Sequence, residues 1–182
     1  MGISDELLVK YELKVDDMVS QELIDGILIQ EEKLNIKNRM LRQLRHRIRS
    51  THELELRFQR DGYDQNLVRE VIQGLCQEGI LNNEQMAWAF INDNTNINPH
   101  GNQHIISELK KRGVSEEVFK DILAQRDEKE IALKFFNKKL NMFDLNNIKE
   151  KRKAINRLLS RGFTPSIVYE IINEKKKGEH DQ

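Results

Sequence analysis

The sequence predicts an all-α protein, and two features of its composition support this fold class. The 182 residues include only two prolines, and the β-branched and aromatic residues nowhere form the alternating runs of strands. Hydrophobic residues make up 38 % of the chain and charged residues 33 %, which favours an elongated helical protein over one compact sphere. A third feature, an internal repeat, extends the prediction to a curved tandem array of three three-helix modules with a short helical N-terminal extension.

The repeat is anchored by three glycines, Gly62, Gly113 and Gly162, which lie 51 and 49 residues apart. Each follows an amphipathic stretch with apolar residues four and eight positions earlier, a pattern that predicts a helix ending in a left-handed glycine. After each glycine come an apolar residue and then a residue whose side chain can cap the next helix. The spacing leaves room for about three helices of ordinary length. The three capping residues are Asp64, Ser115 and Thr164.

The same pattern sets the expected domain boundaries. We expect a helical extension over 1–32, repeats over 33–81, 82–126 and 127–177, and a polar tail over 178–182. The middle helix of the first repeat should begin with a capping box formed by a serine and a glutamate three residues later. The expected helices are 33–47, 50–60 and 64–77 in the first repeat, 83–91, 102–112 and 115–124 in the second, and 127–140, 147–161 and 164–176 in the third.

The zero net charge conceals four segregated blocks. Residues 1–35 hold 3 basic and 9 acidic groups, and residues 36–60 hold 8 and 2. Residues 61–131 hold 7 and 13, and residues 132–182 hold 12 and 6. Attraction to phosphate acts within a Debye length of roughly 8 Å at physiological salt, so neutrality of the whole chain does not exclude nucleic acid. The blocks suit a partner of mixed charge equally well.

The sequence offers no catalytic residues, no cofactor site and no metal site. His100 and His104 stand four residues apart, but no nearby cysteine or acidic pair completes a metal shell. Cys76 shares a helix with apolar neighbours and is expected to be a small buried hydrophobe rather than a nucleophile. No glycine-rich phosphate loop occurs. We therefore predict a protein that is not an enzyme.

The aromatic residues could in principle stack on the bases of single-stranded nucleic acid, but their helical setting favours core packing. They are Trp88, Phe90, Phe135, Phe136 and Phe143. The single cysteine cannot form an internal disulfide, and no apolar stretch approaches the roughly 20 residues of a membrane span. The first residues lack the pattern of a secretory signal. We expect a cytoplasmic protein without membrane contact.

Basic clusters recur before each repeat glycine and are the strongest candidates for a binding face. A helix beginning at Ser50 beside arginines could hold an anion. The alternative is that these cations are solvated or favoured by the negative end of a helix dipole. The lysine run 175–177 is interpreted as a frayed end. The candidate face consists of Arg42, Arg45, Arg47, Arg49, Ser50, Lys110, Lys111, Arg112, Lys151, Arg152, Arg157 and Arg161.

Four stretches resemble the RecX family. The segment 47–54 (Arg-Ile-Arg-Ser-Thr-His-Glu-Leu) resembles the Arg-x-Arg-Ser-x-x-Glu-Leu signature of that family. The segments 79–87, 105–114 and 158–163 resemble the family's later motifs in the same order, so the resemblance covers about residues 33–173.

The resemblance implies a three-repeat monomer that lies in the groove of a RecA filament and makes at most weak direct contact with DNA. Family members inhibit the ATPase, strand-exchange and co-protease activities of RecA by blocking filament growth or promoting disassembly. The alternative that the residues leave open is a stand-alone nucleic-acid-binding protein that acts through its basic repeats.

Overall fold

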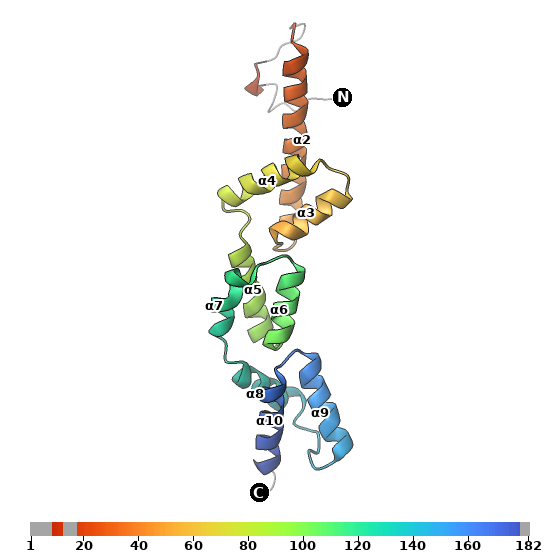
Figure 1. The fold of residues 1–182 in the computed structure, drawn as a ribbon, viewed down its shortest axis with the longest axis vertical. Coiled ribbons are helices and arrows are strands. Elements are labelled where there is room, and N and C mark those ends of the chain that lie inside the picture. The colour runs from red at the N-terminus through yellow and green to blue at the C-terminus, as the bar shows by residue number, and fades with distance from the viewer. Residues whose placement is uncertain (1–8, 13–17, 179–182) are drawn as a thin grey trace. The chain divides into compact units, whose positions relative to one another are not determined.

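The computed structural model describes residues 9–12 and 18–178, and helices dominate this part of the chain (Figure 1). No strand occurs among the described residues, so the all-α prediction is confirmed. None of the described helices is long and apolar enough to cross a membrane. The helices are α2 (Gln21–Leu44), α3 (Thr51–Arg60), α4 (Gln65–Gln77), α5 (Asn83–Asn96), α6 (Asn102–Lys111), α7 (Glu116–Ala124), α8 (Glu128–Lys139), α9 (Ile148–Ser160) and α10 (Pro165–Gly178).

The chain divides into two compact units, Met1–Asn82 and Asn83–Gln182. Much of the expected N-terminal extension (1–8 and 13–17) and residues 179–182 of the expected tail lie outside the described residues. Helix α2 begins at Gln21 and not at residue 33 as expected, because Ser20 caps it by accepting a hydrogen bond from the Leu23 amide at 3.2 Å. No proline interrupts the segment 21–44, so one continuous helix crosses the expected boundary at residue 33.

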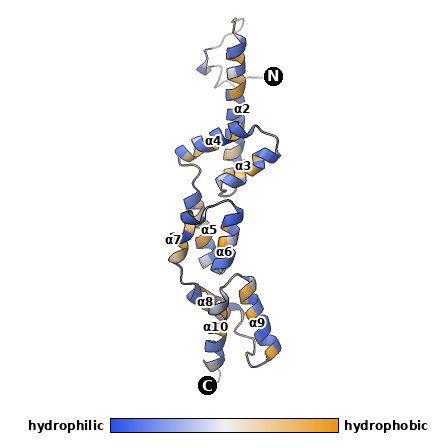
Figure 2. Cartoon of the chain, in the orientation of Figure 1, coloured by the Kyte–Doolittle hydropathy of each residue, from blue (hydrophilic) through white to orange (hydrophobic). Residues whose placement is uncertain are grey.

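In the first unit, α2, α3 and α4 share one hydrophobic core. Met40 of α2 and Leu54 and Phe58 of α3 are fully buried, and α4 contributes a row of aliphatic side chains. The apolar side chains recur at helical spacing, and Figure 2 shows them gathered on one side of the helices while the other side is polar. The remaining members of this cluster are Ile36, Val68, Val71, Ile72, Leu75 and Leu81.

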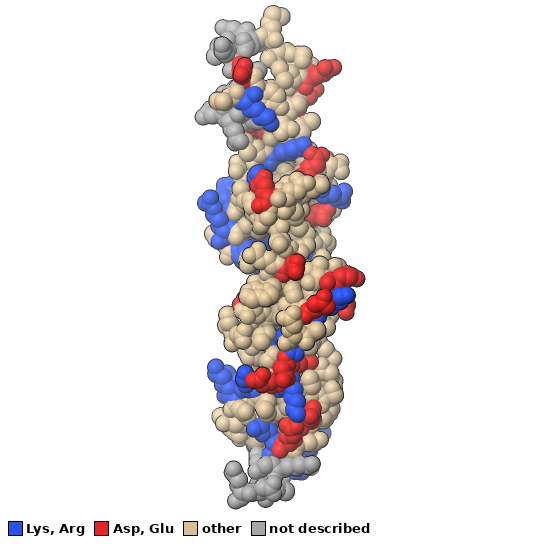
Figure 3. All heavy atoms as spheres, turned by 90° about the vertical axis from the view of Figure 1, so that its left-hand side faces the viewer, with Lys and Arg blue, Asp and Glu red and all other residues tan. Residues whose placement is uncertain are grey.

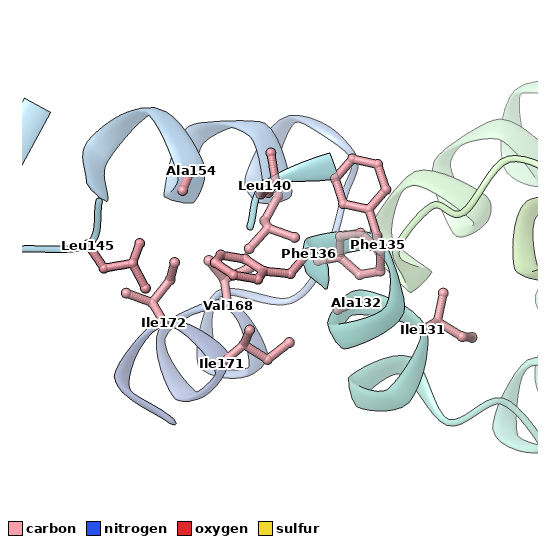
Figure 4. Packing of buried hydrophobic residues seen from close by; sticks show 12 residues of the cluster. Ile131, Ala132, Phe135, Phe136, Leu140, Leu145, Ala154, Val168, Ile171 and Ile172 are labelled. Atoms are coloured by element: carbon pink, nitrogen blue, oxygen red, sulfur yellow. The ribbon is translucent and has the colours of Figure 1, made fainter. Parts of the chain in front are cut away.

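The second unit contains two hydrophobic clusters. The first takes its buried residues from α5, α6 and α7, with Ile105 and Leu109 of α6 at its centre. The second takes them from α8, α9 and α10 and includes Phe136, which points into the cluster in Figure 4. In each cluster the buried positions follow helical spacing, as the sequence pattern predicted.

The three repeat glycines adopt the left-handed backbone that the sequence predicted, with φ of 87° at Gly62, 70° at Gly113 and 77° at Gly162. In each turn the residue after the glycine donates its amide to the carbonyl of the buried residue that stands four positions before the glycine, at 3.0–3.3 Å. This is the Schellman arrangement, which satisfies a helix-end carbonyl. Glycine at these positions therefore ends α3, α6 and α9.

Only one of the three expected side-chain caps forms. Asp64 accepts from the amides of Asn66 and Leu67, at 2.8 and 3.0 Å. Ser115 precedes α7, but its side chain accepts no hydrogen bond from the helix amides. The Thr164 hydroxyl donates to Glu128 at 2.9 Å. The expected cap at Ser115 is therefore wrong, and Thr164 instead joins two helices of the second unit.

A polar joint connects the two clusters of the second unit. Arg126, half-buried, donates to Thr95 Oγ1 at 2.7 Å, to the carbonyls of Asn94 and His100 at 3.2 and 2.8 Å, and to the Asn102 side chain. The buried Glu128 carboxylate accepts from the Asn102 and Thr164 amides at 2.9 and 3.1 Å. Because these groups are buried and paired, they fix α6 against α8 and α10.

The backbone adds a second set of contacts to this joint. The Gly101 amide donates to the Arg161 carbonyl at 2.9 Å, and the Gln103 amide donates to the Gly162 carbonyl at 3.1 Å. A Cβ atom at Gly101 would overlap the Gly162 carbonyl. The start of α6 and the turn after α9 can therefore approach this closely only with glycine at residue 101.

Candidate binding surface

The first basic cluster lies where α2 ends and α3 begins. Helix α2 ends at Leu44, so Arg45 is its C-terminal cap, and residues 46–49 form the connection to α3. Arg45 and Arg47 are exposed, and Arg47 pairs with Glu53 at 2.7 Å. Figure 3 shows basic side chains gathered at one edge of the first unit on the face that it displays. An exposed ion pair of this kind contributes little stability, so Arg47 can exchange Glu53 for a partner.

Ser50 serves the helix and is not presented to a ligand. Its hydroxyl accepts from the Glu53 amide at 3.0 Å, while the Glu53 carboxylate accepts from the Ser50 amide at 3.0 Å. Ser50 is fully buried. The predicted capping box is therefore confirmed, and the role of Ser50 in the binding face is to set the start of α3 beside the arginines.

A shallow basin, called here the arginine basin, is lined by Arg39, Arg42, Gln43, His46, Arg49 and Arg57. Arg39 donates to Asp61 at 2.8 Å and to the Tyr63 hydroxyl at 3.1 Å, and Arg57 lies 3.6 Å from the same Asp61 carboxylate. One carboxylate thus faces two guanidinium groups. The basin therefore keeps an excess of positive charge.

Arg49 lies in the arginine basin with a hydrogen-bonding group left over. Its Nε atom is buried without a hydrogen-bond partner among the described residues, and so is Gln43 Oε1 in the same basin. Partial burial lowers the pKa of Arg49, and the neighbouring Arg47 lowers it further. An unsatisfied buried donor on a cation is costly, so Arg49 holds its place in the basin at some expense of stability.

The second basic cluster, at the end of α6, is engaged in local contacts. Lys110 pairs with Glu116 at 2.7 Å and Lys111 with Glu108 at 2.8 Å. The Arg112 guanidinium lies 4.3 Å from the centre of the Phe90 ring. Both lysines remain exposed, but their charge is largely balanced where they stand.

The third cluster divides between exposed and structural residues. Arg152 is exposed and Lys151 half-exposed on α9, and no hydrogen bond or ion pair involves either side chain within the described residues. Arg157 lies 5.1 Å from the centre of the Phe143 ring. Arg161 donates to the Asn98 side chain and the Pro99 carbonyl at 2.8 and 2.9 Å and lies over Phe135. Arg161 therefore contributes mainly to the joint of the second unit.

Two expectations about burial are wrong. Cys76 is exposed, because α4 presents Ile72 and Leu75 to the core and residue 76 falls beside that face. Trp88 is 56 % exposed, because Met86 and Ala87 supply the buried face of α5.

The other aromatic residues are closer to the expectation that they pack in the core. Phe135 and Phe136 are buried, while Phe90 and Phe143 are half-buried beneath arginines. The rings of His100 and His104 stack at 4.2 Å, and among the described residues no group of three or more His, Cys, Asp or Glu side chains could hold a metal ion.

No protein-family model matches the chain. It is similar to the regulatory protein RecX of Clostridium perfringens strain 13, with 26 % identity over 181 residues that cover 96 % of this chain and 84 % of that protein. It is also similar to the regulatory protein RecX of Mycolicibacterium smegmatis, with 27 % identity over 154 residues, or 80 % of this chain and 82 % of that protein. These similarities in sequence and fold support the RecX family for this chain. The names of these relatives support a RecX regulatory role.

Crystal structures of RecX proteins share this fold. One matches with a TM-score of 0.73 at 20 % identity, covering 94 % of this chain and 86 % of its own. RecX from Lactobacillus salivarius matches with a TM-score of 0.69 at 21 % identity, covering 80 % of this chain and 97 % of its own.

The predicted binding face left out three arginine or histidine residues of the arginine basin. Arg39, His46 and Arg57 join Arg42 and Arg49, which were predicted. Arg39, Arg42 and His46 stand at spacings of three and four residues, so their shared face of a helix could have been recognised. Arg57 could not, because only the packing of α3 beside the end of α2 brings it into the basin.

Proposed function

We propose that this RecX-family chain binds RecA and RecA–single-stranded-DNA filaments and inhibits the ATPase, strand-exchange and co-protease activities of RecA. In this way it would restrain recombination, DNA repair and the SOS response. The observation that carries the proposal is the similarity to regulatory RecX proteins over 96 % of the chain. No chemistry by the chain itself is required, because a ligand that binds one state of a polymer more tightly shifts its equilibrium.

The arginine basin supports this proposal because it offers an excess of cations with limited internal pairing. Arg42 is exposed, and its only hydrogen bond within the described residues goes to the Asn38 carbonyl at 3.4 Å. Charges of this kind steer association with an acidic surface and fix its register. The repeats 33–81, 82–126 and 127–177 are proposed as modules of a monomer that contact successive RecA protomers, either blocking extension or promoting disassembly.

A second candidate function is binding to nucleic acid without RecA. The observation that favours it is the arginine basin, whose guanidinium groups can pair with phosphate oxygens. This candidate predicts tight binding to bare DNA with a steep dependence on salt, because each neutralised phosphate adds to the slope.

The experiment that separates the two candidates measures ATP hydrolysis by RecA on single-stranded DNA while this protein is added in substoichiometric amounts. Inhibition well below one protein per RecA protomer supports the filament modulator. Absence of inhibition, together with tight salt-sensitive binding to bare DNA, would show that the second candidate is the function.

Paired variants test the arginine basin. Arg42→Gln combined with Arg49→Gln should raise the inhibitory concentration by about tenfold, because two attractive charges at one interface are lost. Arg60→Gln combined with Arg69→Gln is the matched control, since it removes the same charge from exposed residues of the same unit. Circular dichroism checks that both variants remain helical. Equal inhibition by the two folded variants would exclude the arginine basin as the RecA-binding surface.

A further inference from the structure

A groove with a volume of about 600 Å³ runs along α8 in the second unit. Its walls are the segment 95–99 at the end of α5, the segment 125–127 before α8, and the side of α8 from Glu130 to Lys139, with Arg161 beside them. This space, called here the α8 groove, falls within the roughly 300–1,000 Å³ of ligand-binding pockets. It lies outside the arginine basin and outside the polar contacts of Glu128.

The floor of the α8 groove is apolar. Ile131 and Phe135, one helical turn apart, line it and lie at the edge of the hydrophobic cluster in Figure 4, whereas Phe136 points inward. Ile97, on the opposite wall, is 76 % exposed. An aliphatic side chain placed between Ile97 and Ile131 would therefore remove apolar surface from water on both sides.

The rim of the α8 groove is basic. Lys138 and Lys139 make no hydrogen bond or ion pair within the described residues, although both are exposed beside the groove. The two carboxylates of the lining are already occupied: Asp127 accepts from the Glu130 amide at 2.9 Å, and Glu130 pairs with Lys134 at 2.6 Å. Positive charge is thus left over at the end of α8 where the lysines stand.

We propose that the α8 groove binds an extended acidic peptide segment of a partner protein, with one aliphatic side chain as its anchor on the floor. The side of α8 that lines the groove is about 15 Å long, so an extended segment of about five residues spans it. This second site goes beyond the function proposed above and does not depend on binding to RecA.

The lining favours a peptide over single-stranded nucleic acid. Bases bind to open aromatic faces, but the guanidinium of Arg161 lies 4.5 Å from the centre of the Phe135 ring, the only aromatic ring of this groove's lining among the described residues. The other apolar groups of the groove are aliphatic, which suits an aliphatic side chain better than a nucleic-acid base. An acidic peptide can place its charges at the lysines and its aliphatic anchor between the isoleucines.

The test measures fluorescence anisotropy of a labelled peptide, Asp-Glu-Asp-Leu-Glu-Asp-Glu, with the full chain at low ionic strength. Saturable binding is expected, weakened about tenfold by Lys138→Glu combined with Lys139→Glu. The matched control, Lys120→Glu combined with Lys153→Glu, makes the same charge change on exposed residues of the second unit outside the groove and should bind as the parent does. Replacing the peptide's leucine with serine should also weaken binding about tenfold.

Three results would overturn the proposal. The first is no saturable binding at protein concentrations up to about 1 mM. The second is equal binding of the leucine and serine peptides, which would mean that charge alone attracts them. The third is displacement of the peptide by a single-stranded oligonucleotide, with binding of that oligonucleotide lost in the Lys138/Lys139 variant, which would assign the groove to nucleic acid. RecA is absent from this assay, so its result is independent of the proposed regulatory function.

Discussion

Replacing Gly101 with alanine separates the effect of tertiary contact from the effect of backbone conformation. Gly101 has a φ of −76°, which any residue adopts without strain. Its added Cβ would overlap the Gly162 carbonyl, so the start of α6 would have to move away from the turn after α9. The expected loss comes from overpacking, about 1–3 kcal/mol. Two backbone hydrogen bonds, from Gly101 and Gln103, are stretched as well and add about 1 kcal/mol.

Gly62→Ala is the matched comparison. Gly62 has a φ of 87° but no atom within 4 Å of an added Cβ, so only backbone strain opposes the substitution. A left-handed backbone costs an alanine about 1–2 kcal/mol, of which part is offset by the smaller entropy of the unfolded chain. We therefore expect Gly101→Ala to lower the free energy of unfolding of the second unit by about 3 kcal/mol and Gly62→Ala to lower that of the first unit by about 1 kcal/mol.

The assay is hydrogen exchange of backbone amides in the full chain under native conditions, because it reports each unit separately. Gly101→Ala should accelerate exchange in α6 and α8–α10 and leave α2–α4 unchanged, and Gly62→Ala should do the reverse. Denaturant unfolding followed by circular dichroism gives the size of each loss. If Gly101→Ala were no more destabilising than Gly62→Ala, the close approach of residues 101 and 162 would be refuted.

Further predictions concern the same joint and its pH dependence. Arg126→Met should destabilise the second unit by about 3 kcal/mol, measured by denaturant unfolding, because it removes the donor to the His100 carbonyl, to Thr95 Oγ1 and to the Asn102 side chain. A loss below about 0.5 kcal/mol would contradict this network. Burial and the adjacent His104 lower the pKa of His100 below its ordinary value of 6.5, so the unfolded chain binds the additional proton more readily. The free energy of unfolding should therefore fall as pH drops through about 6.5. Thermal melts above and below that pH should show a smaller dependence in His100→Asn. An identical pH dependence in both proteins would exclude His100 as its source.

The sequence predicted most helix ends to within one residue because the signals for them are local, but α2 ends at Leu44 and not at residue 47, and α5 continues to Asn96 and not only to residue 91. The glycine turns at residues 62, 113 and 162 follow from the apolar spacing and from the need for a left-handed residue at each helix end. The capping box of Ser50 and Glu53 is a similarly short-range signal. The start of α2 was missed because the helix continues through a polar segment without a proline, and its Ser20 cap lies outside the repeat pattern.

The binding residues were predicted only in part, because the same basic side chain can serve a ligand or the fold. Arg42 and Arg49 remain in the arginine basin, but Arg161 is committed to the Asn98 side chain and the Pro99 carbonyl, more than sixty residues away in sequence. The Ser50 hydroxyl caps α3 by accepting from the Glu53 amide. Whether a basic side chain remains available to a ligand depends on its partners within the fold, and those partners come from other helices.

The sequence by itself determined the helical class and the recurring turns, because helix periodicity and capping act over a few residues. Its motifs, such as the one at 47–54, also resemble the RecX family. Only the tertiary structure decided that Arg126 and Glu128 tie the second unit together, that Gly101 must lack a side chain, and that α8 presents an apolar floor beside unpaired lysines. These features depend on contacts between residues distant in the chain. The physical reason is that burial and pairing are properties of packed surfaces, and a linear pattern specifies a surface only after its helices have packed.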